Sequence, residues 1–255
     1  MPNFLLYFSL SILLLGCSID DLPSCVGSGD EGLICKDYQY IDGIYNGLNN
    51  YYYDESGSVL LSKVTQSKSG KEDGSIFYNY NSVNELVSIE YINYLGDVVR
   101  VKTIKYNDGH VVQEENSGDI NDKIIYQYSS GLLQNIIYME GNIIKSKDSL
   151  EYVANTSDLH KTFKYYGGIL SSITYNVWFG NSILKQTVYD NGGNKKGSVV
   201  RRYSPNKLLT EKVDYNVENK VIVREVYKYM AGYLVEIIKE EEGGEIFEKI
   251  VYQRF

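Results

Sequence analysis

The stretch Lys-Tyr-Tyr-Gly-Gly-Ile-Leu-Ser-Ser-Ile, Lys164 to Ile173, decides the fold of this chain. Its two glycines tolerate the positive φ angles of a tight hairpin turn, and the flanking Tyr, Ile and Leu residues favour extended strands. A similar sequence pattern recurs at Tyr78–Ile89, Tyr126–Ile136 and Lys228–Ile237. The repeated element is therefore a β-hairpin unit of about 22 to 26 residues.

Turn-forming residues recur roughly every 9 to 14 residues from Tyr40 to the end of the chain. We expect turns centred near Gly70, Gly96, Gly109, Gly131, Gly168, Gly193 and Gly232. Such short turns join neighbouring antiparallel strands, because parallel pairing needs crossovers of about a dozen residues or more. No segment after Tyr40 has the apolar period of a long helix. The sequence predicts an all-β fold, an antiparallel up-and-down meander of repeated hairpins in a long twisted or curled sheet, with a closed β-barrel as the alternative.

The tyrosine content indicates how deeply this sheet is buried. The chain has 26 Tyr against 7 Phe and 1 Trp. A tyrosine ring is largely apolar, but its hydroxyl needs a hydrogen-bond partner, which favours half-buried faces over a dry core. We expect the rings to pack across neighbouring strands, with Tyr80, Tyr128, Tyr165 and Tyr229 at equivalent points of successive repeats.

The repeated pattern of Tyr-x-Tyr, turn, Leu and Ile resembles the tyrosine-rich YD repeats of Rhs-type cell-surface proteins, and also the Tyr-rich repeats of Bacteroidota lipoproteins. A Tyr-Asp pair is present at Tyr53-Asp54 and at Tyr189-Asp190, whereas the Gly-Arg-Leu of the YD repeats is absent. The resemblance implies a β-hairpin array at the cell surface. It supplies no catalytic residue.

The chain begins with an apolar run, Phe4–Leu15, that ends beside a cysteine. A run of about a dozen residues is too short for a membrane-spanning helix and suits the apolar region of a secretory signal. Leu14-Leu15-Gly16-Cys17 resembles the lipobox of bacterial lipoproteins. This resemblance implies that residues 1–16 are a signal peptide and that Cys17 carries the lipid, with an uncleaved signal helix as the alternative.

The residues after Cys17 bear on the location of the mature chain. Ser18-Ile19-Asp20-Asp21 resembles the acidic export signal of surface-displayed Bacteroidota lipoproteins. This resemblance implies a lipid-anchored protein of the outer membrane, displayed on the cell surface. A periplasm-facing protein with an acidic linker is the alternative.

Residues 17–39 form an acidic, Gly-rich tether that holds Cys25 and Cys35, and residues 40–255 form the Tyr-rich hairpin domain. Two cysteines in an exported chain are expected to be oxidised, so we predict a Cys25–Cys35 disulfide. A metal site is the weaker interpretation, because the only histidines are His110 and His160, and neither is near in sequence.

Charge and motifs exclude several classes of function. The net charge of −8 and the isoelectric point near 4.9 argue against nucleic-acid binding, which needs clustered Lys and Arg. The zinc-protease, P-loop and serine-hydrolase signatures are absent from the sequence, so we predict no catalytic residue, metal ligand or cofactor site. The acidic segments Glu240–Glu245 and Asp190–Asn194 are interpreted as hairpin turns.

We therefore expect a non-enzymatic, outer-membrane-anchored lipoprotein with a binding or structural role, whose partner is a protein or a glycan on the Tyr-rich sheet. One alternative is an envelope enzyme that acts on polysaccharide through carboxylates brought together by the fold. Another is an immunity-type protein that binds a toxin. A deep cleft with two carboxylates about 5–10 Å apart would favour the enzyme, whereas a flat or gently concave sheet would favour binding.

Overall fold

A computed structural model describes residues 33–53, 59–66, 72–180 and 182–254, and all regular structure in these ranges is β. The strands are β1 (Ile34–Ile41), β2 (Ile44–Tyr53), β3 (Val59–Gln66), β4 (Glu72–Tyr80), β5 (Leu86–Asn93), β6 (Val98–Asn107), β7 (His110–Gly118), β8 (Asp122–Ser129), β9 (Leu132–Glu140), β10 (Ile143–Tyr152), β11 (Leu159–Tyr166), β12 (Ile169–Phe179), β13 (Ser182–Asp190), β14 (Lys195–Tyr203), β15 (Leu209–Tyr215), β16 (Val221–Met230), β17 (Tyr233–Glu241) and β18 (Ile246–Arg254). None of the described segments is a helix that is long and apolar enough to cross a lipid bilayer.

The turns lie where the glycine pattern predicts them. Between β6 and β7, Asp108 and Gly109 have φ angles of +50° and +74°, as a two-residue hairpin turn of the primed type requires. The predicted turns at Gly96, Gly109, Gly131, Gly168, Gly193 and Gly232 are all confirmed. The turn predicted near Gly70 lies outside the described residues.

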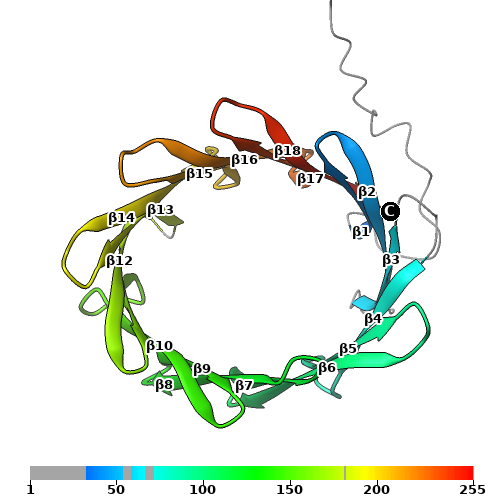
Figure 1. Ribbon diagram of the computed structural model, residues 1–255, viewed down its shortest axis with the longest axis horizontal. Helices are drawn as coiled ribbons and strands as arrows, with labels where there is room; N and C mark the ends of the chain where they lie inside the picture. Colours follow the sequence, from blue (N-terminus) through cyan, green and yellow to red (C-terminus); the bar gives the residue numbers. More distant parts are fainter. Residues whose placement is uncertain (1–32, 54–58, 67–71, 181, 255) are drawn as a thin grey trace, which may run out of the picture.

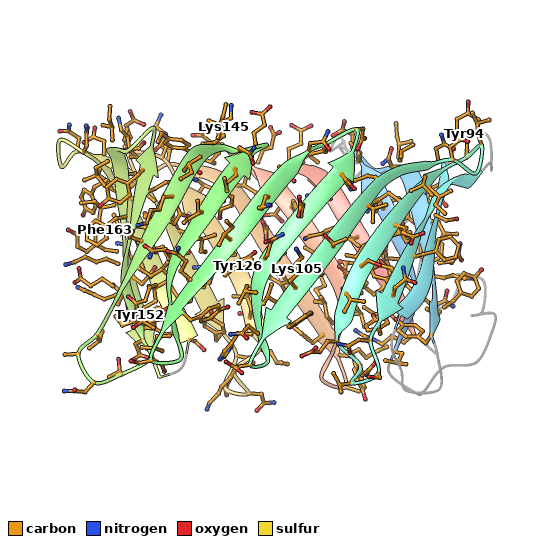
Figure 2. All side chains as sticks on the ribbon, turned by 90° about the horizontal axis from the view of Figure 1, so that it is seen from below. Tyr94, Lys105, Tyr126, Lys145, Tyr152 and Phe163 are labelled. Atoms are coloured by element: carbon orange, nitrogen blue, oxygen red, sulfur yellow. The ribbon has the colours of Figure 1, made fainter. Side chains whose placement is uncertain are left out.

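Each strand pairs with the next one along the chain, and every pair is antiparallel, which confirms the predicted up-and-down meander. In addition, β1 pairs with β18, with Tyr38 opposite Val251. This pairing closes the curled sheet of eighteen strands into a ring, so the structure adopts the closure that the sequence left open as an alternative. Figure 1 shows the ring along its axis, and Figure 2 shows its tilted strands from the side.

The sheet begins earlier in the chain than predicted. β1 starts at Ile34, six residues before the predicted boundary at Tyr40, and it pairs with both β2 and β18. The end of the segment interpreted as a tether is therefore part of the ring. This strand was difficult to predict, because its Cys-Lys-Asp segment lacks the alternation of apolar and polar residues seen in later strands.

The register of the strand pairs separates the outer face of the ring from the inner face. Residues directly opposite each other in an antiparallel pair project to the same side, and neighbours along a strand project to opposite sides. Phe163 lies on the outer surface in Figure 2 and is opposite Ile173, which is opposite Tyr189. These three residues face outward, and the alternate residues, such as Thr162 and Thr174, face the interior.

The interior of the ring is not a packed core. None of the described side chains is less than 2% exposed, and the buried apolar residues are only Cys35, Tyr38, Val213 and Val251. All eight residues of β5 are partly exposed, and so are the inward-facing Ile136 and Tyr138 of β9. Eighteen strands about 4.8 Å apart and tilted by about 40° give a ring roughly 35 Å across between backbones, too wide for one layer of side chains to fill. Solvent therefore reaches both faces of the sheet.

Candidate functional site

Tyrosines line the inner face, and one set of them forms a regular band at a single end of the ring. Each hairpin unit pairs an odd strand with the following even strand. In eight of these units, an inward side chain near the end of the even strand donates a hydrogen bond to a backbone carbonyl at the start of the odd strand. We call these residues the aromatic rim. They are Tyr53, Tyr106, Tyr128, Tyr152, Trp178, Tyr203 and Tyr229, with Arg254 in the last unit.

The aromatic rim coincides with a shift of strand register at the junction between one hairpin unit and the next. The register shifts between Lys105 and Tyr106, for example, and the Tyr106 hydroxyl then bonds the Leu86 carbonyl at 3.0 Å. A side-chain donor of this kind satisfies a backbone carbonyl, which needs a hydrogen-bond partner. The hydroxyls of the aromatic rim thus have a structural role and are not available to a ligand.

The predicted alignment of Tyr80, Tyr128, Tyr165 and Tyr229 is correct for three residues and wrong for one. Tyr80, Tyr128 and Tyr229 each lie next to the register shift that ends an even strand. Tyr165 instead lies on the odd strand β11, near the other end of the ring, opposite Lys147. Gly-rich turns occur at both ends of the ring. A tyrosine that precedes such a turn can therefore lie at either end, and the sequence pattern does not distinguish them.

Midway along the strands, inner tyrosines bond to carboxylates instead of carbonyls. Asp37 of β1 is only 5% exposed and accepts hydrogen bonds from the Tyr51 hydroxyl at 2.6 Å and from the Asn49 amide at 2.9 Å. Burial raises the pKa of Asp37, although both hydrogen bonds act in the opposite direction. Burial and the neighbouring Asp37 raise the pKa of Tyr51.

Two similar clusters lie elsewhere on the inner face. The Tyr126 hydroxyl donates to Glu114 at 2.8 Å, and Glu114 also forms an ion pair with Lys102. On β16, Tyr227 donates to Glu225, which pairs with Lys212 at 3.0 Å. Burial raises the pKa of Glu225, but the Tyr227 and Lys212 contacts outweigh it and the pKa is lowered. The inner face is therefore an amphipathic wall of aromatic rings, acids and bases.

The outer face carries charges in mid-strand. Arg224 contacts Glu211 at 2.8 Å and Glu240 at 3.7 Å, and Glu236 contacts Lys228 at 2.6 Å and Lys249 at 3.0 Å. A lipid-facing band would exclude such ions from the middle of the strands. The outer surface over β15 to β18 is therefore suited to water.

The predicted lipid and disulfide residues lie at or beyond the edge of the described structure. Cys17 and Cys25 lie outside the described residues. Cys35 is the second residue of β1 and is 3% exposed. Lipidation of Cys17 and the Cys25–Cys35 disulfide stay predictions.

The polar groups considered in the sequence occupy ordinary positions. The His110 ring stacks on Tyr128, with centroids 4.8 Å apart, and His160 lies edge-on to Tyr175 at 6.2 Å. The Asp190 carboxylate accepts hydrogen bonds from the backbone of Gly192 and Asn194 and so closes a turn. The Glu240–Glu245 segment forms the hairpin tip between β17 and β18. Within the described residues, no group of three or more His, Cys, Asp or Glu side chains is placed to hold a metal ion.

The structure also places outward-facing residues that the sequence analysis did not select. Tyr175 and Tyr189 form a right-angled pair beside Thr187 and Asn191, at a hollow between β12 and β13. The only sequence signal was the alternation of Ile173, Tyr175 and Val177 along one strand. That pattern fits a buried face equally well.

No protein-family model matches this chain, and no curated protein is similar to it. Among solved structures, a porin-like protein from Bacteroides uniformis matches with a TM-score of 0.45 and 10% identity, over 89% of this chain and 100% of that one. A porin-like protein from Bacteroides vulgatus matches with a TM-score of 0.33 and 8% identity, over 87% and 98% of the two chains. The TcdB2-TccC3-Cdc42 structure matches with a TM-score of 0.34 and 11% identity, over 79% of this chain and 13% of that one. No residue role is carried over from these proteins.

Proposed function

We propose that this chain is a non-enzymatic binding protein of the cell envelope, and that the inner face of its ring is the surface that holds a macromolecular partner. The observation that carries the proposal is an interior lined with tyrosines and paired charges that stays open to solvent. No described strand or turn crosses the ring (Figure 1). A protein that used its interior only as a core would fill it with apolar side chains.

Tyrosine suits a binding wall for two reasons. Its ring offers a large apolar area with few rotatable bonds, and its hydroxyl can exchange hydrogen bonds with a partner. Tyr78 and Tyr138 face the interior, by their register with Ile89 and Ile124. Both are inner tyrosines away from the aromatic rim, so we assign them to the binding wall.

The distribution of carboxylates supports a binding role rather than an enzymatic one. Four hollows in the described surface are lined by at most one acidic residue each, namely Glu151, Asp190 or Asp108. Hydrolysis of a glycosidic bond by the usual mechanism needs two carboxyl groups about 5–10 Å apart. The toxin-binding alternative is one form of the proposed protein partner.

The proposal includes a lipid anchor at Cys17 in the outer membrane, with the ring on the cell surface. Acyl chains on Cys17 would contribute roughly 0.8 kcal/mol of membrane affinity per buried CH₂. We expect the wild-type chain to partition into detergent and to incorporate labelled palmitate, and Cys17→Ser to partition into water. Equal partition of the two forms, with no label in the wild type, would refute the anchor.

Site-specific photo-crosslinking in intact cells tests the binding wall. A photoreactive phenylalanine analogue replaces Tyr138 on the inner face or, as the control, Tyr52, which is 41% exposed on the outer face. We expect a discrete adduct with a protein or glycan from position 138 and none from position 52. An adduct from position 52 alone, or no adduct from either position together with no binding on a glycan array, would refute the proposal.

A further inference from the structure

The outward-facing tyrosines of β12 and β13 differ from those of the aromatic rim in how their hydroxyls are used. The hydroxyls of the aromatic rim donate to backbone carbonyls, as Tyr152 does to Leu133 at 2.7 Å. The hydroxyls of Tyr175 and Tyr189 make no hydrogen bond to another described residue. Buried or half-buried phenols normally find a partner. These two hydroxyls therefore remain available to water or to a ligand.

The two rings form the walls of a hollow on the outer face. Their centroids are 5.5 Å apart and their planes cross at 88°. The hollow has a volume of about 600 Å³, within the range of about 300–1,000 Å³ typical of small-molecule sites. It is lined by Ile173, Tyr175 and Val177 on β12 and by Thr187, Tyr189 and Asn191 on β13 and its turn. Tyr175 and Val177 are 36% and 52% exposed, so the hollow opens directly to solvent.

Apart from Asp190, the polar side chains that line the hollow are neutral. The Thr187 hydroxyl and the Asn191 amide, like the two phenols, make no hydrogen bond to another described residue. The nearest carboxylate, Asp190, accepts bonds from Gly192 and Asn194 and contacts Lys196 at 3.3 Å. A cation beside the hollow, Lys161, lies 5.7 Å from the Tyr175 ring centre and pairs with Glu151 at 3.0 Å. Both of these charges are already compensated, and apart from Asp190 no charged side chain lines the hollow.

This combination matches the chemistry of a sugar. A pyranose has one face rich in C–H groups, which packs on an aromatic ring, and an edge of hydroxyls that both donate and accept hydrogen bonds. An apolar ligand would leave the four polar groups of the hollow unpaired, at a cost in affinity. A charged ligand would find no uncompensated counter-charge among the residues that line the hollow.

We propose that the hollow between β12 and β13 is a carbohydrate-binding site, which packs a pyranose of a neutral glycan against Tyr175 and bonds its hydroxyls through Thr187, Tyr189 and Asn191. The site lies on the outer face and is separate from the binding wall inside the ring. With a single, already engaged carboxylate, it would bind the sugar without cleaving it.

The test uses the full chain carrying Cys17→Ser and three neutral hexasaccharides, a β-1,4-glucan, a β-1,3-glucan and an α-mannan, with saturation-transfer NMR and calorimetry. We expect at least one hexasaccharide to bind through its ring C–H protons. Tyr175→Ala should weaken that binding at least tenfold, and Thr187→Val should weaken it severalfold. Tyr175→Phe, which keeps the ring, should bind within about threefold of the parent.

Two further variants separate this site from the rest of the ring. Tyr52→Ala removes an exposed outer tyrosine on β2 and is the control, which should not change hexasaccharide affinity. Tyr138→Ser removes a tyrosine of the binding wall and shows whether the inner face binds the same sugars. Absence of binding by all three hexasaccharides at millimolar concentration would overturn the proposal. So would unchanged affinity in Tyr175→Ala with a wild-type β-sheet spectrum. Loss of affinity in Tyr138→Ser alone would move sugar binding to the interior and would also overturn it.

Discussion

At the scale of single residues, the structure depends on which group accepts the hydrogen bond of each tyrosine hydroxyl. On the inner face, Tyr51, Tyr126 and Tyr227 donate to Asp37, Glu114 and Glu225. Burial, and then the neighbouring carboxylate, raises the pKa of all three phenols. The charged form of the phenol is therefore strongly disfavoured in the folded ring.

This pKa shift has a consequence for stability at alkaline pH. An unfolded tyrosine loses its proton near pH 10, whereas the folded Tyr126 keeps it. The folded state then holds more protons, so the stabilisation is complete below about pH 10 and is lost as the pH rises above it. Tyr126→Phe should lower the free energy of unfolding by about 1 kcal/mol at pH 7, because one hydrogen bond is lost. It should also reduce the additional decrease in the free energy of unfolding between pH 10 and 11.

Urea unfolding at both pH values measures these two effects. Tyr175→Phe is the matched control at pH 7, since its hydroxyl bonds no other described residue and its removal should change stability by less than about 0.5 kcal/mol. Equal destabilisation by the two substitutions at pH 7 would contradict the role given to the Tyr126–Glu114 bond.

At the scale of strands and turns, much of the fold could be predicted, because the signals are local. The glycine pattern predicted the turns near Gly96, Gly109 and Gly232, and the β-branched and aromatic residues predicted the strands between them. Tyr165 was assigned to the wrong end of the ring because the Gly167-Gly168 turn resembles the turns at the other end. The neutral hollow at Tyr175 was missed because it joins residues from two strands and a turn, and no single stretch of sequence displays it.

The turn between β16 and β17 contains a residue that fits it poorly. Ala231 has a φ angle of +50°, a conformation in which an L residue with a Cβ is strained and which Asn and Gly tolerate. The corresponding turn between β6 and β7 has Asp108 at this position, with the same φ of +50°. Ala231→Asn should therefore raise the free energy of unfolding by about 0.5–1 kcal/mol. Thermal or urea unfolding would measure the gain.

The other alanine of the chain provides the control for this substitution. Ala154 lies in the turn between β10 and β11 and is not among the residues with positive φ. Ala154→Asn should therefore give no gain. A similar gain at both positions would mean that the effect of Asn is general to these turns and does not come from the backbone conformation of Ala231.

At the scale of the whole molecule, closure of the ring is what the sequence could not decide. The contact that joins β1 to β18 links residues such as Tyr38 and Gln253, whose separation in the chain is 215 residues. Hairpin signals extend over a few residues and contain no information on such a pairing. Closure removes the two sheet edges, which otherwise expose unpaired backbone groups to aggregation. It also makes the tyrosine-lined face an interior, on which the proposed binding role depends.

Closure can be tested with cysteines placed on opposite strands. Gln39 of β1 is opposite Ile250 of β18, and directly opposite Cα atoms in antiparallel strands lie about 4.5–5.5 Å apart, within the range of a disulfide. Gln39→Cys with Ile250→Cys should form a linked peptide pair, detected by mass spectrometry under mild oxidation. Ile237→Cys with Ile250→Cys is the control, because β17 and β18 pair whether or not the ring closes. A disulfide in the control without one between positions 39 and 250 would mean that the sheet is open in solution, and the inner face would then be one side of an open surface.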